Sequence, residues 1–153
     1  MRLTKRMNAI VGYVRPDSTV FDICCDHGLM GLLALAQRND SEVVFVDQSE
    51  RALAAVRESL KDLDPSLAAR AKVLCTAAET IVVPESPSDF IIAGVGTHTV
   101  ISIIDHLFSK DLSTHRLILA PQQKSQPLRR YLQKKGWGLV DEHVAELRLV
   151  LDK

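Results

Sequence analysis

Short apolar runs alternate with helix-spaced apolar positions along most of this chain. The runs are rich in Val, Ile, Leu and Phe, as is typical of parallel strands that are covered on both faces. They are STVFDIC (residues 18–24), EVVFVD (42–47), AKVLC (71–75), DFIIAGV (89–95) and HRLILAP (115–121). Each of these runs is predicted to form a strand.

The segments between these strands have apolar residues at helical spacing, so they are predicted to form helices. Leu3, Met7, Ile10 and Val14 share one helical face, so the first helix is expected over residues 3–14, before Pro16. Further helices are expected over residues 29–38, 100–108 and 126–135, and another after Ser49, with Ala52, Val56, Leu60 and Leu63 on one face. Ser49 and Ser125 precede two of them as N-caps, and Gly136 follows the last one.

This order of elements predicts an α/β fold. Strands separated by helices form right-handed crossovers in a parallel sheet. The last two apolar runs, residues 137–144 and 146–153, have no helix between them and should pair as an antiparallel hairpin. We therefore expect a Rossmann-like, mostly parallel seven-stranded sheet with a C-terminal antiparallel hairpin.

Composition narrows the class of protein. The 153 residues suit one domain, and 19 basic and 19 acidic residues cancel, so no global field draws in nucleic acid or a membrane surface. No signal peptide or long apolar span is evident, which favours a soluble, cytoplasmic protein. Three cysteines, two of them adjacent, fit neither a disulfide framework nor a zinc pattern, so we expect no metal site.

The segment FDICCDHGLMG, residues 21–31, carries the candidate chemistry. In an open α/β sheet, ligands bind beyond the carboxyl ends of the strands, where glycine and a helix N-terminus favour an anionic group. Asp47 ends the second strand about twenty residues later, where an acid typically holds ribose hydroxyls. The dinucleotide fingerprint needs three glycines, and this segment has only Gly28 and Gly31, so the pattern indicates ribose without choosing a cofactor.

Asp22, followed by a loop of small residues, resembles the opening motif of class I S-adenosylmethionine-dependent methyltransferases. The N-terminal segment then resembles the bacterial tRNA (adenine-22-N1)-methyltransferase family, whose signature is D-I-G-x-D-H-[AG]-x-L. Two later segments, DFIIAGVGTHTVISIID and LILAPQQKSQPLRRYLQKKGWGLVDE, are similar to conserved blocks of the same family. The resemblance implies a class I methyltransferase sandwich, S-adenosyl-L-methionine as cofactor, and tRNA or another RNA as substrate.

Asp26 lies four residues after Asp22, where the loop should open toward the substrate, so Asp26 is predicted to face the acceptor base and take part in catalysis, with His27 orienting it or contacting the base. A structural ion pair between Asp26 and His27 is the alternative. The expected cofactor-binding residues are Asp22, Cys24, Cys25, Gly28, Asp47, Gln48, Ala77, Ala78, Gly94 and Gly96.

The chain departs from the family pattern at several positions. Cys24 and Thr97 replace glycines, and Ala77 stands where an acid would hold the adenine amino group. The family has a second, helical coiled-coil domain, whereas here we expect a single methyltransferase domain over residues 1–153. RNA would then be held by this domain alone, or with a second copy or a protein partner.

Basic residues offer possible phosphate contacts or simply solvated helix faces. They are Arg2, Lys5, Arg6, Lys124, Arg129, Arg130, Lys134 and Lys135. Three functions stay open from the sequence: an RNA methyltransferase, a degenerate non-catalytic module that binds RNA or a protein, and a nicotinamide-dependent enzyme.

Overall fold

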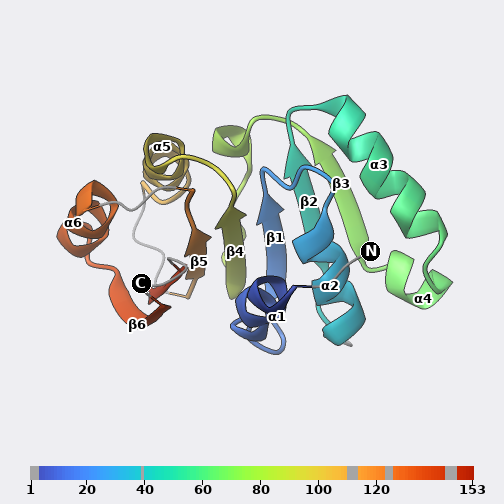
Figure 1. Cartoon of the computed structure of the whole chain (residues 1–153), viewed down its shortest axis with the longest axis horizontal. Helices are drawn as coiled ribbons and strands as arrows, with labels where there is room; N and C mark the ends of the chain where they lie inside the picture. The colour runs from blue at the N-terminus through green and yellow to red at the C-terminus, as the bar shows by residue number, and fades with distance from the viewer. Residues whose placement is uncertain (1–3, 39, 110–113, 123–125, 144–147) are drawn as a thin grey trace.

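The computed structural model describes residues 4–38, 40–109, 114–122, 126–143 and 148–153. Its centre is a seven-stranded sheet in the order β3-β2-β1-β4-β5-β7-β6 (Figure 1). The strands are β1 (Thr19–Ile23), β2 (Val43–Asp47), β3 (Ala71–Cys75), β4 (Ser88–Ala93), β5 (Arg116–Ala120), β6 (Gly138–His143) and β7 (Arg148–Asp152). The first five are parallel, and β7 pairs antiparallel with both β5 and β6. The predicted parallel sheet and terminal hairpin are confirmed.

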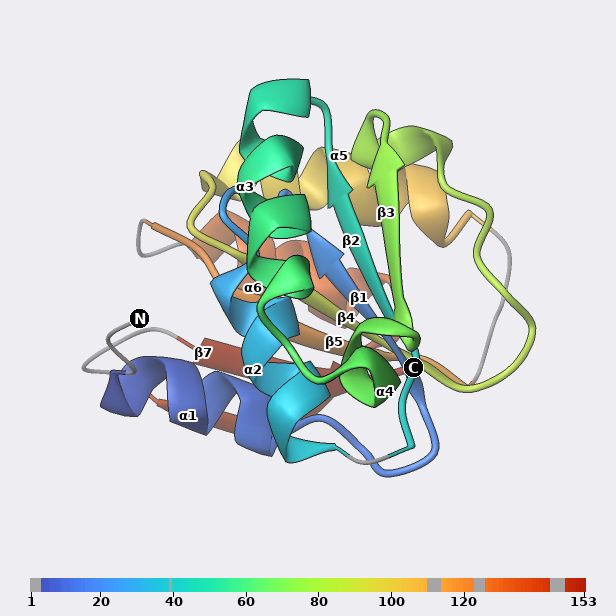
Figure 2. The ribbon, with the colours of Figure 1, turned by 90° about the vertical axis from the view of Figure 1, so that its right-hand side faces the viewer.

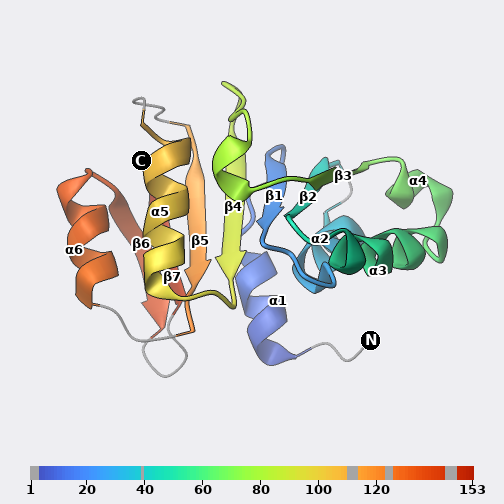
Figure 3. The same cartoon turned by 90° about the horizontal axis from the view of Figure 1, so that it is seen from above.

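Helices cover both faces of this sheet (Figure 2). They are α1 (Lys5–Gly12), α2 (Leu29–Gln37), α3 (Glu50–Lys61), α4 (Pro65–Ala68), α5 (Thr97–Leu107) and α6 (Gln126–Lys134), with a 3₁₀ turn η1 (Ala78–Thr80). One core cluster joins α1, α2 and α3 to one sheet face, and a second joins η1, α5 and α6 to the other. Figure 3 shows β3 near one end of this arrangement and β6 near the other.

Alternation along β1 shows why both faces are apolar. Val20 packs into the cluster beneath α1 and α2, whereas Phe21 and Ile23 pack into the cluster beneath α5. Successive side chains of a strand point to opposite faces, so a strand buried on both sides needs an almost continuous apolar run. Asp22 interrupts that run and is nevertheless buried.

The N-terminal helix is shorter than the prediction of residues 3–14. It begins at Lys5 because the Thr4 hydroxyl accepts a hydrogen bond from the Met7 N–H at 3.1 Å, and it ends at Gly12. The Ser49 cap of α3 is confirmed, since its hydroxyl accepts from the Ala52 N–H at 3.2 Å. The Ser125 cap lies outside the described residues, and the sequence did not predict α4 or η1.

Strand order puts the topological switch point of the sheet between β1 and β4, the place where open α/β sheets generally bind ligands. The chain moves from β1 to β2 and β3 on one side, then returns to place β4 on the other side of β1. Parallel strands end at the same edge, and the two loops leaving β1 and β4 diverge there. Within the part of the chain that the structure describes, no helix is both long enough and apolar enough to span a membrane.

Candidate functional site

The turn that follows β1 adopts an unusual backbone path. Cys24, Asp26 and Gly28 have φ angles of 54°, 51° and 74°, all in the left-handed region. Glycine adopts this region freely and aspartate more readily than most residues, whereas cysteine there is strained. The Cys25 N–H donates to the Val46 carbonyl at 3.0 Å, which fastens the turn to β2.

Asp22 links β1 to the start of α2. Its side chain is buried, and Oδ2 accepts a hydrogen bond from the Gly31 N–H at 2.8 Å. That amide belongs to the first turn of α2, where N–H groups lack partners within the helix. Burial raises the pKa of Asp22 to about 7; the hydrogen bond from Gly31 opposes this rise and the nearby charge of Asp47 adds to it.

Asp47 ends β2 and holds the same turn from the other side. Its Oδ2 accepts from the Asp26 N–H and its Oδ1 from the Ser49 N–H, each at 2.9 Å. A carboxylate oxygen has capacity for a second hydrogen bond, so both remain able to accept from neighbouring hydroxyls. Asp47 therefore has a structural role in the turn that leaves acceptor capacity on both carboxylate oxygens.

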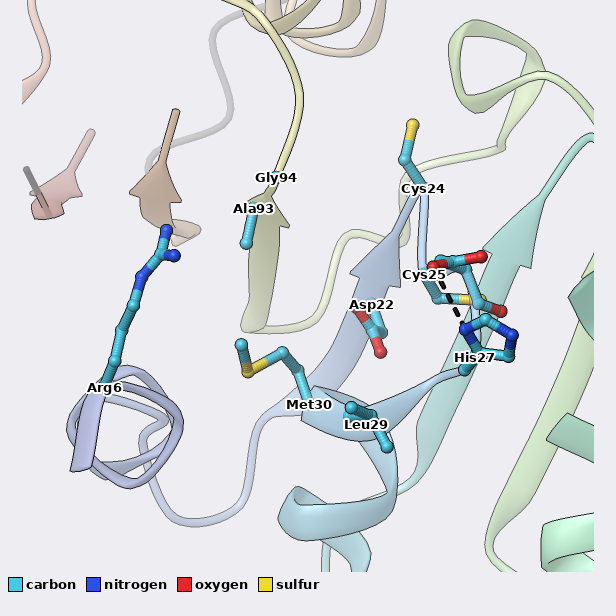
Figure 4. A pocket seen from close by; sticks show the side chains of 10 residues that line it. Arg6, Asp22, Cys24, Cys25, His27, Leu29, Met30, Ala93 and Gly94 are labelled. Carbon is cyan, nitrogen blue, oxygen red and sulfur yellow. Dashed lines mark hydrogen bonds and ion pairs between the residues drawn. The ribbon is translucent and has the colours of Figure 1, made fainter. Parts of the chain in front are cut away.

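A cavity of about 250 Å³ opens beside Asp22, between the ends of β1 and β4 (Figure 4). The lining includes Asp22, Cys24, Cys25, Asp26, His27 and Gly94, all predicted site residues. Arg6, Leu29, Met30 and Ala93 complete it. None of these four was among the predicted catalytic or cofactor-binding residues, and Arg6 was predicted as a possible phosphate contact.

Asp26 and His27 stand at the open side of this cavity. Their side chains are 75% and 65% exposed, and His27 Nδ1 lies 3.1 Å from Asp26 Oδ2. The pair is thus accessible to a large acceptor molecule, unlike Asp22. Asp22 is thus a buried acid on the inside of the cavity, whereas Asp26 and His27 form an exposed pair at its opening.

The two cysteine thiols of the turn are poor nucleophiles. Burial raises the pKa of Cys24 to about 11, with the charges of Asp47, Glu79 and Asp22 adding to the rise. Burial also raises the pKa of Cys25, and the same two aspartates contribute. Both thiols are therefore protonated near neutral pH, and they act as small side chains in the cavity wall.

Several predicted cofactor residues do not line this cavity. Gly28 is buried against α3 and β2, where an added Cβ would lie 2.8 Å from Val56 Cγ2, so packing explains that glycine. Gly96 is the N-cap of α5 with an ordinary φ of −71°.

The remaining predicted residues lie along the sheet edge beyond Asp47. Gln48 is exposed directly after β2, and Ala77 and Ala78 follow β3 at the start of η1. Thr76 N–H donates to the Asp47 carbonyl at 2.9 Å, which ties this edge to β2. A ligand reaching from the cavity across Asp47 would pass over these positions.

The basic residues have mixed surroundings. Arg129 pairs with Glu142, and Lys135 lies 3.8 Å from Asp105. Arg2 and Lys124 lie outside the described residues. Among the described ones, Arg6 is the basic residue that faces the cavity.

A family model described as a methyltransferase domain matches residues 3–148. Similar solved structures include Sp1610 of Streptococcus pneumoniae with S-adenosyl-L-methionine bound, 22% identical with a TM-score of 0.80; the match covers 98% of this chain and 72% of that one. The M1A22 tRNA methyltransferase TrmK of B. subtilis is 22% identical with a TM-score of 0.78, over 98% of this chain and 65% of that one.

A third similar structure is magnesium protoporphyrin IX methyltransferase (ChlM) from Synechocystis PCC 6803 with bound SAH, 17% identical with a TM-score of 0.73. That match covers 96% of this chain and 80% of the other. No curated protein sequence matches this chain. At these identities the solved structures establish the fold, which is the Rossmann-like methyltransferase fold expected from the sequence.

Proposed function

Because this chain belongs to the family of methyltransferase domains, we propose that it transfers a methyl group from S-adenosyl-L-methionine to N1 of an adenine in tRNA. The observation that carries the proposal is the arrangement of Asp22 and Asp47. They lie at the carboxyl ends of adjacent strands, and both accept hydrogen bonds from the segment that runs from Asp26 to Gly31.

The residues at this edge fit the cofactor. Asp47 has acceptor capacity for two ribose hydroxyls, and the half-buried Ala77, next to the buried Ala78, offers an apolar contact for an adenine ring. The 250 Å³ cavity is smaller than a site that encloses a whole drug-sized ligand, about 300–1,000 Å³, so it suits the amino-acid end alone. When bound, S-adenosyl-L-methionine supplies a methyl group on a positively charged sulfur.

Asp26 and His27 are the residues we assign to the acceptor. Methylation at N1 leaves a positive charge on adenine, which a nearby carboxylate stabilises. Asp26 can also accept a hydrogen bond from the exocyclic amine and so orient the base, while His27 Nδ1 holds the carboxylate at 3.1 Å. Their exposure on the open side of the cavity leaves room for a base on an RNA strand.

Two lines of support favour tRNA as the substrate. The motifs at residues 21–31, 89–105 and 117–142 resemble the tRNA (adenine-22-N1)-methyltransferase family. A similar structure is a tRNA methyltransferase of that specificity. ChlM shares the fold and has another substrate, so the fold alone does not choose the acceptor.

Calorimetric titration with S-adenosyl-L-methionine, S-adenosylhomocysteine and NAD tests the cofactor. We expect binding of at least one of the first two and none of NAD, because the turn lacks the three glycines of a dinucleotide site. NAD binding tighter than that of both other ligands would refute the proposal.

Methyl transfer to an unmodified tRNA transcript, followed by digestion and mass spectrometry for N1-methyladenosine, tests the reaction. Asp26→Asn should lower the rate roughly 100-fold while keeping affinity for S-adenosylhomocysteine within about twofold. Asparagine tolerates the left-handed backbone of this position, and the N–H that binds Asp47 is retained. Glu85→Gln, in an exposed loop, is the matched control. Equal rates for wild type and Asp26→Asn would make Asp26 structural.

The presence of Cys24 in the turn supports a second candidate function, that of a non-catalytic module that binds RNA or a protein. It occupies a backbone conformation that suits glycine, and Ala77 lacks the carboxylate of the family pattern. Wild-type protein that binds S-adenosylhomocysteine but methylates no RNA would favour this alternative.

A further inference from the structure

Arg6 contributes a cation to the cavity from outside the β–α repeat. It lies in the first turn of α1 and lines the cavity together with Asp22, Met30 and Ala93. Figure 4 shows its side chain extending from α1 on the side of the cavity away from His27. Its side chain is exposed, and none of the ion pairs or hydrogen bonds found among the described residues involves its guanidinium.

Packing fixes the helix that carries Arg6. Met7, Ile10 and Val11 are buried in the cluster that α1 shares with α2, and Thr4 caps the helix. The neighbouring Arg6 is therefore anchored at the cavity while its long side chain stays in solvent. This gives α1, which is not part of the alternating fold, a direct connection to the site.

The cavity has a basic group and an acidic group on different sides. Arg6 supplies a cation on one side and Asp22 a buried carboxylate on another, with the apolar side chains of Leu29 and Met30 also in the lining. A zwitterionic amino acid has the complementary pattern, a carboxylate and an ammonium group beside an aliphatic chain. A volume of about 250 Å³ suits such a group.

We propose that Arg6 binds the α-carboxylate of the methionyl group of S-adenosyl-L-methionine, with the α-ammonium group on the side of Asp22. This inference rests on the proposed function and names a binding residue for it. A guanidinium presents a planar fork that can bind both oxygens of a carboxylate, whereas a lysine ammonium is a point charge.

A phosphate of RNA is a poorer occupant of the same place. Asp26 also lines the cavity and its carboxylate repels a second anion, as does Asp22 once it is ionised, whereas Arg6 is the one basic residue in the lining. An amino acid brings its own ammonium group toward these acids. The balance of charges thus favours the zwitterion over a phosphate.

The test compares two ligands that differ in one group. Calorimetry measures binding of S-adenosylhomocysteine and of its decarboxylated analogue, which keeps the ammonium group and lacks the carboxylate. We expect wild type to bind S-adenosylhomocysteine about tenfold more tightly than the analogue, the scale of a charged hydrogen bond. Arg6→Gln should lose that difference by weakening S-adenosylhomocysteine alone, and Arg6→Lys should keep part of it.

Lys5→Gln is the matched control, because Lys5 is the adjacent exposed cation and does not line the cavity. It should leave both affinities unchanged, and thermal denaturation should be the same for all variants. If wild type binds S-adenosylhomocysteine and Arg6→Gln weakens both ligands equally or neither, this inference is overturned while the proposed function stands. If wild type binds neither ligand, the proposed function fails and this inference with it.

Discussion

Replacing Gly31 by alanine should destabilise the protein and disturb the site. Gly31 lies in the first turn of α2, directly above Phe45, which is fully buried in β2. A Cβ at this position would lie 2.8 Å from Cζ and 2.9 Å from Cδ1 of the Phe45 ring, and closer still to Cε1. Carbon atoms in ordinary contact are about 3.5–4.0 Å apart, so either the helix or the ring must move.

The magnitude follows from two opposing effects. Alanine improves helix propensity by up to about 1 kcal/mol, whereas overpacking a dense core costs about 1–3 kcal/mol or more. Phe45 is fully buried in a core cluster, and cores are close-packed, so we expect the steric effect to prevail with a net loss of roughly 1–2 kcal/mol. For a chain of this size that loss lowers Tm by about 2–8 °C.

Urea and thermal denaturation of the Gly31→Ala variant measure this loss of stability, with Gly12→Ala as the control. Gly12 ends α1 and a Cβ there meets nothing within 4 Å, so the same substitution should be neutral or stabilising. Phe45→Leu should be less harmful in the Gly31→Ala background than in wild type, since the ring causes the clash. A Gly31→Ala protein as stable as wild type would refute the packing argument.

Three further outcomes follow from the site. Asp47→Ala should weaken S-adenosylhomocysteine binding at least several-fold in calorimetry, because two ribose hydroxyls lose their acceptor; unchanged affinity would place the cofactor elsewhere. Burial raises the pKa of Asp22 from 3.8 to about 7. Between about pH 4 and pH 7 the folded protein therefore keeps a proton that the unfolded chain has lost. The free energy of unfolding consequently falls as the pH rises through this range. The free energy of unfolding of Asp22→Asn, relative to wild type, should therefore increase by roughly 2–4 kcal/mol between pH 4 and pH 8 in urea denaturation, and a constant difference would contradict this. Cys24→Gly should strengthen S-adenosylhomocysteine binding, because glycine relaxes the left-handed backbone and clears the cavity wall; weaker binding would show that the thiol side chain contributes to the site.

Periodicity and strand ends were sufficient to predict much of this protein. The buried runs such as residues 42–47 became parallel strands because a strand covered on both faces needs apolar residues at nearly every position. Asp22 and Asp47 were predicted at one edge because parallel strands end together, and the structure joins both to the turn between them. These features depend on local pattern and on a general rule of sheet topology.

Tertiary packing decided the features that depend on residues distant in sequence. Gly28 matched a cofactor motif, yet its lack of a side chain is explained by Val56 and Phe45, which reach it only when α2 and α3 pack on β2. Arg6 reaches the cavity because α1 docks against α2, a contact that no spacing within either helix encodes. The sequence by itself determined which segments form the sheet and which acids lie at its edge. The packing of helices on that sheet decided which side chains share a cavity, because those distances depend on how separate elements dock.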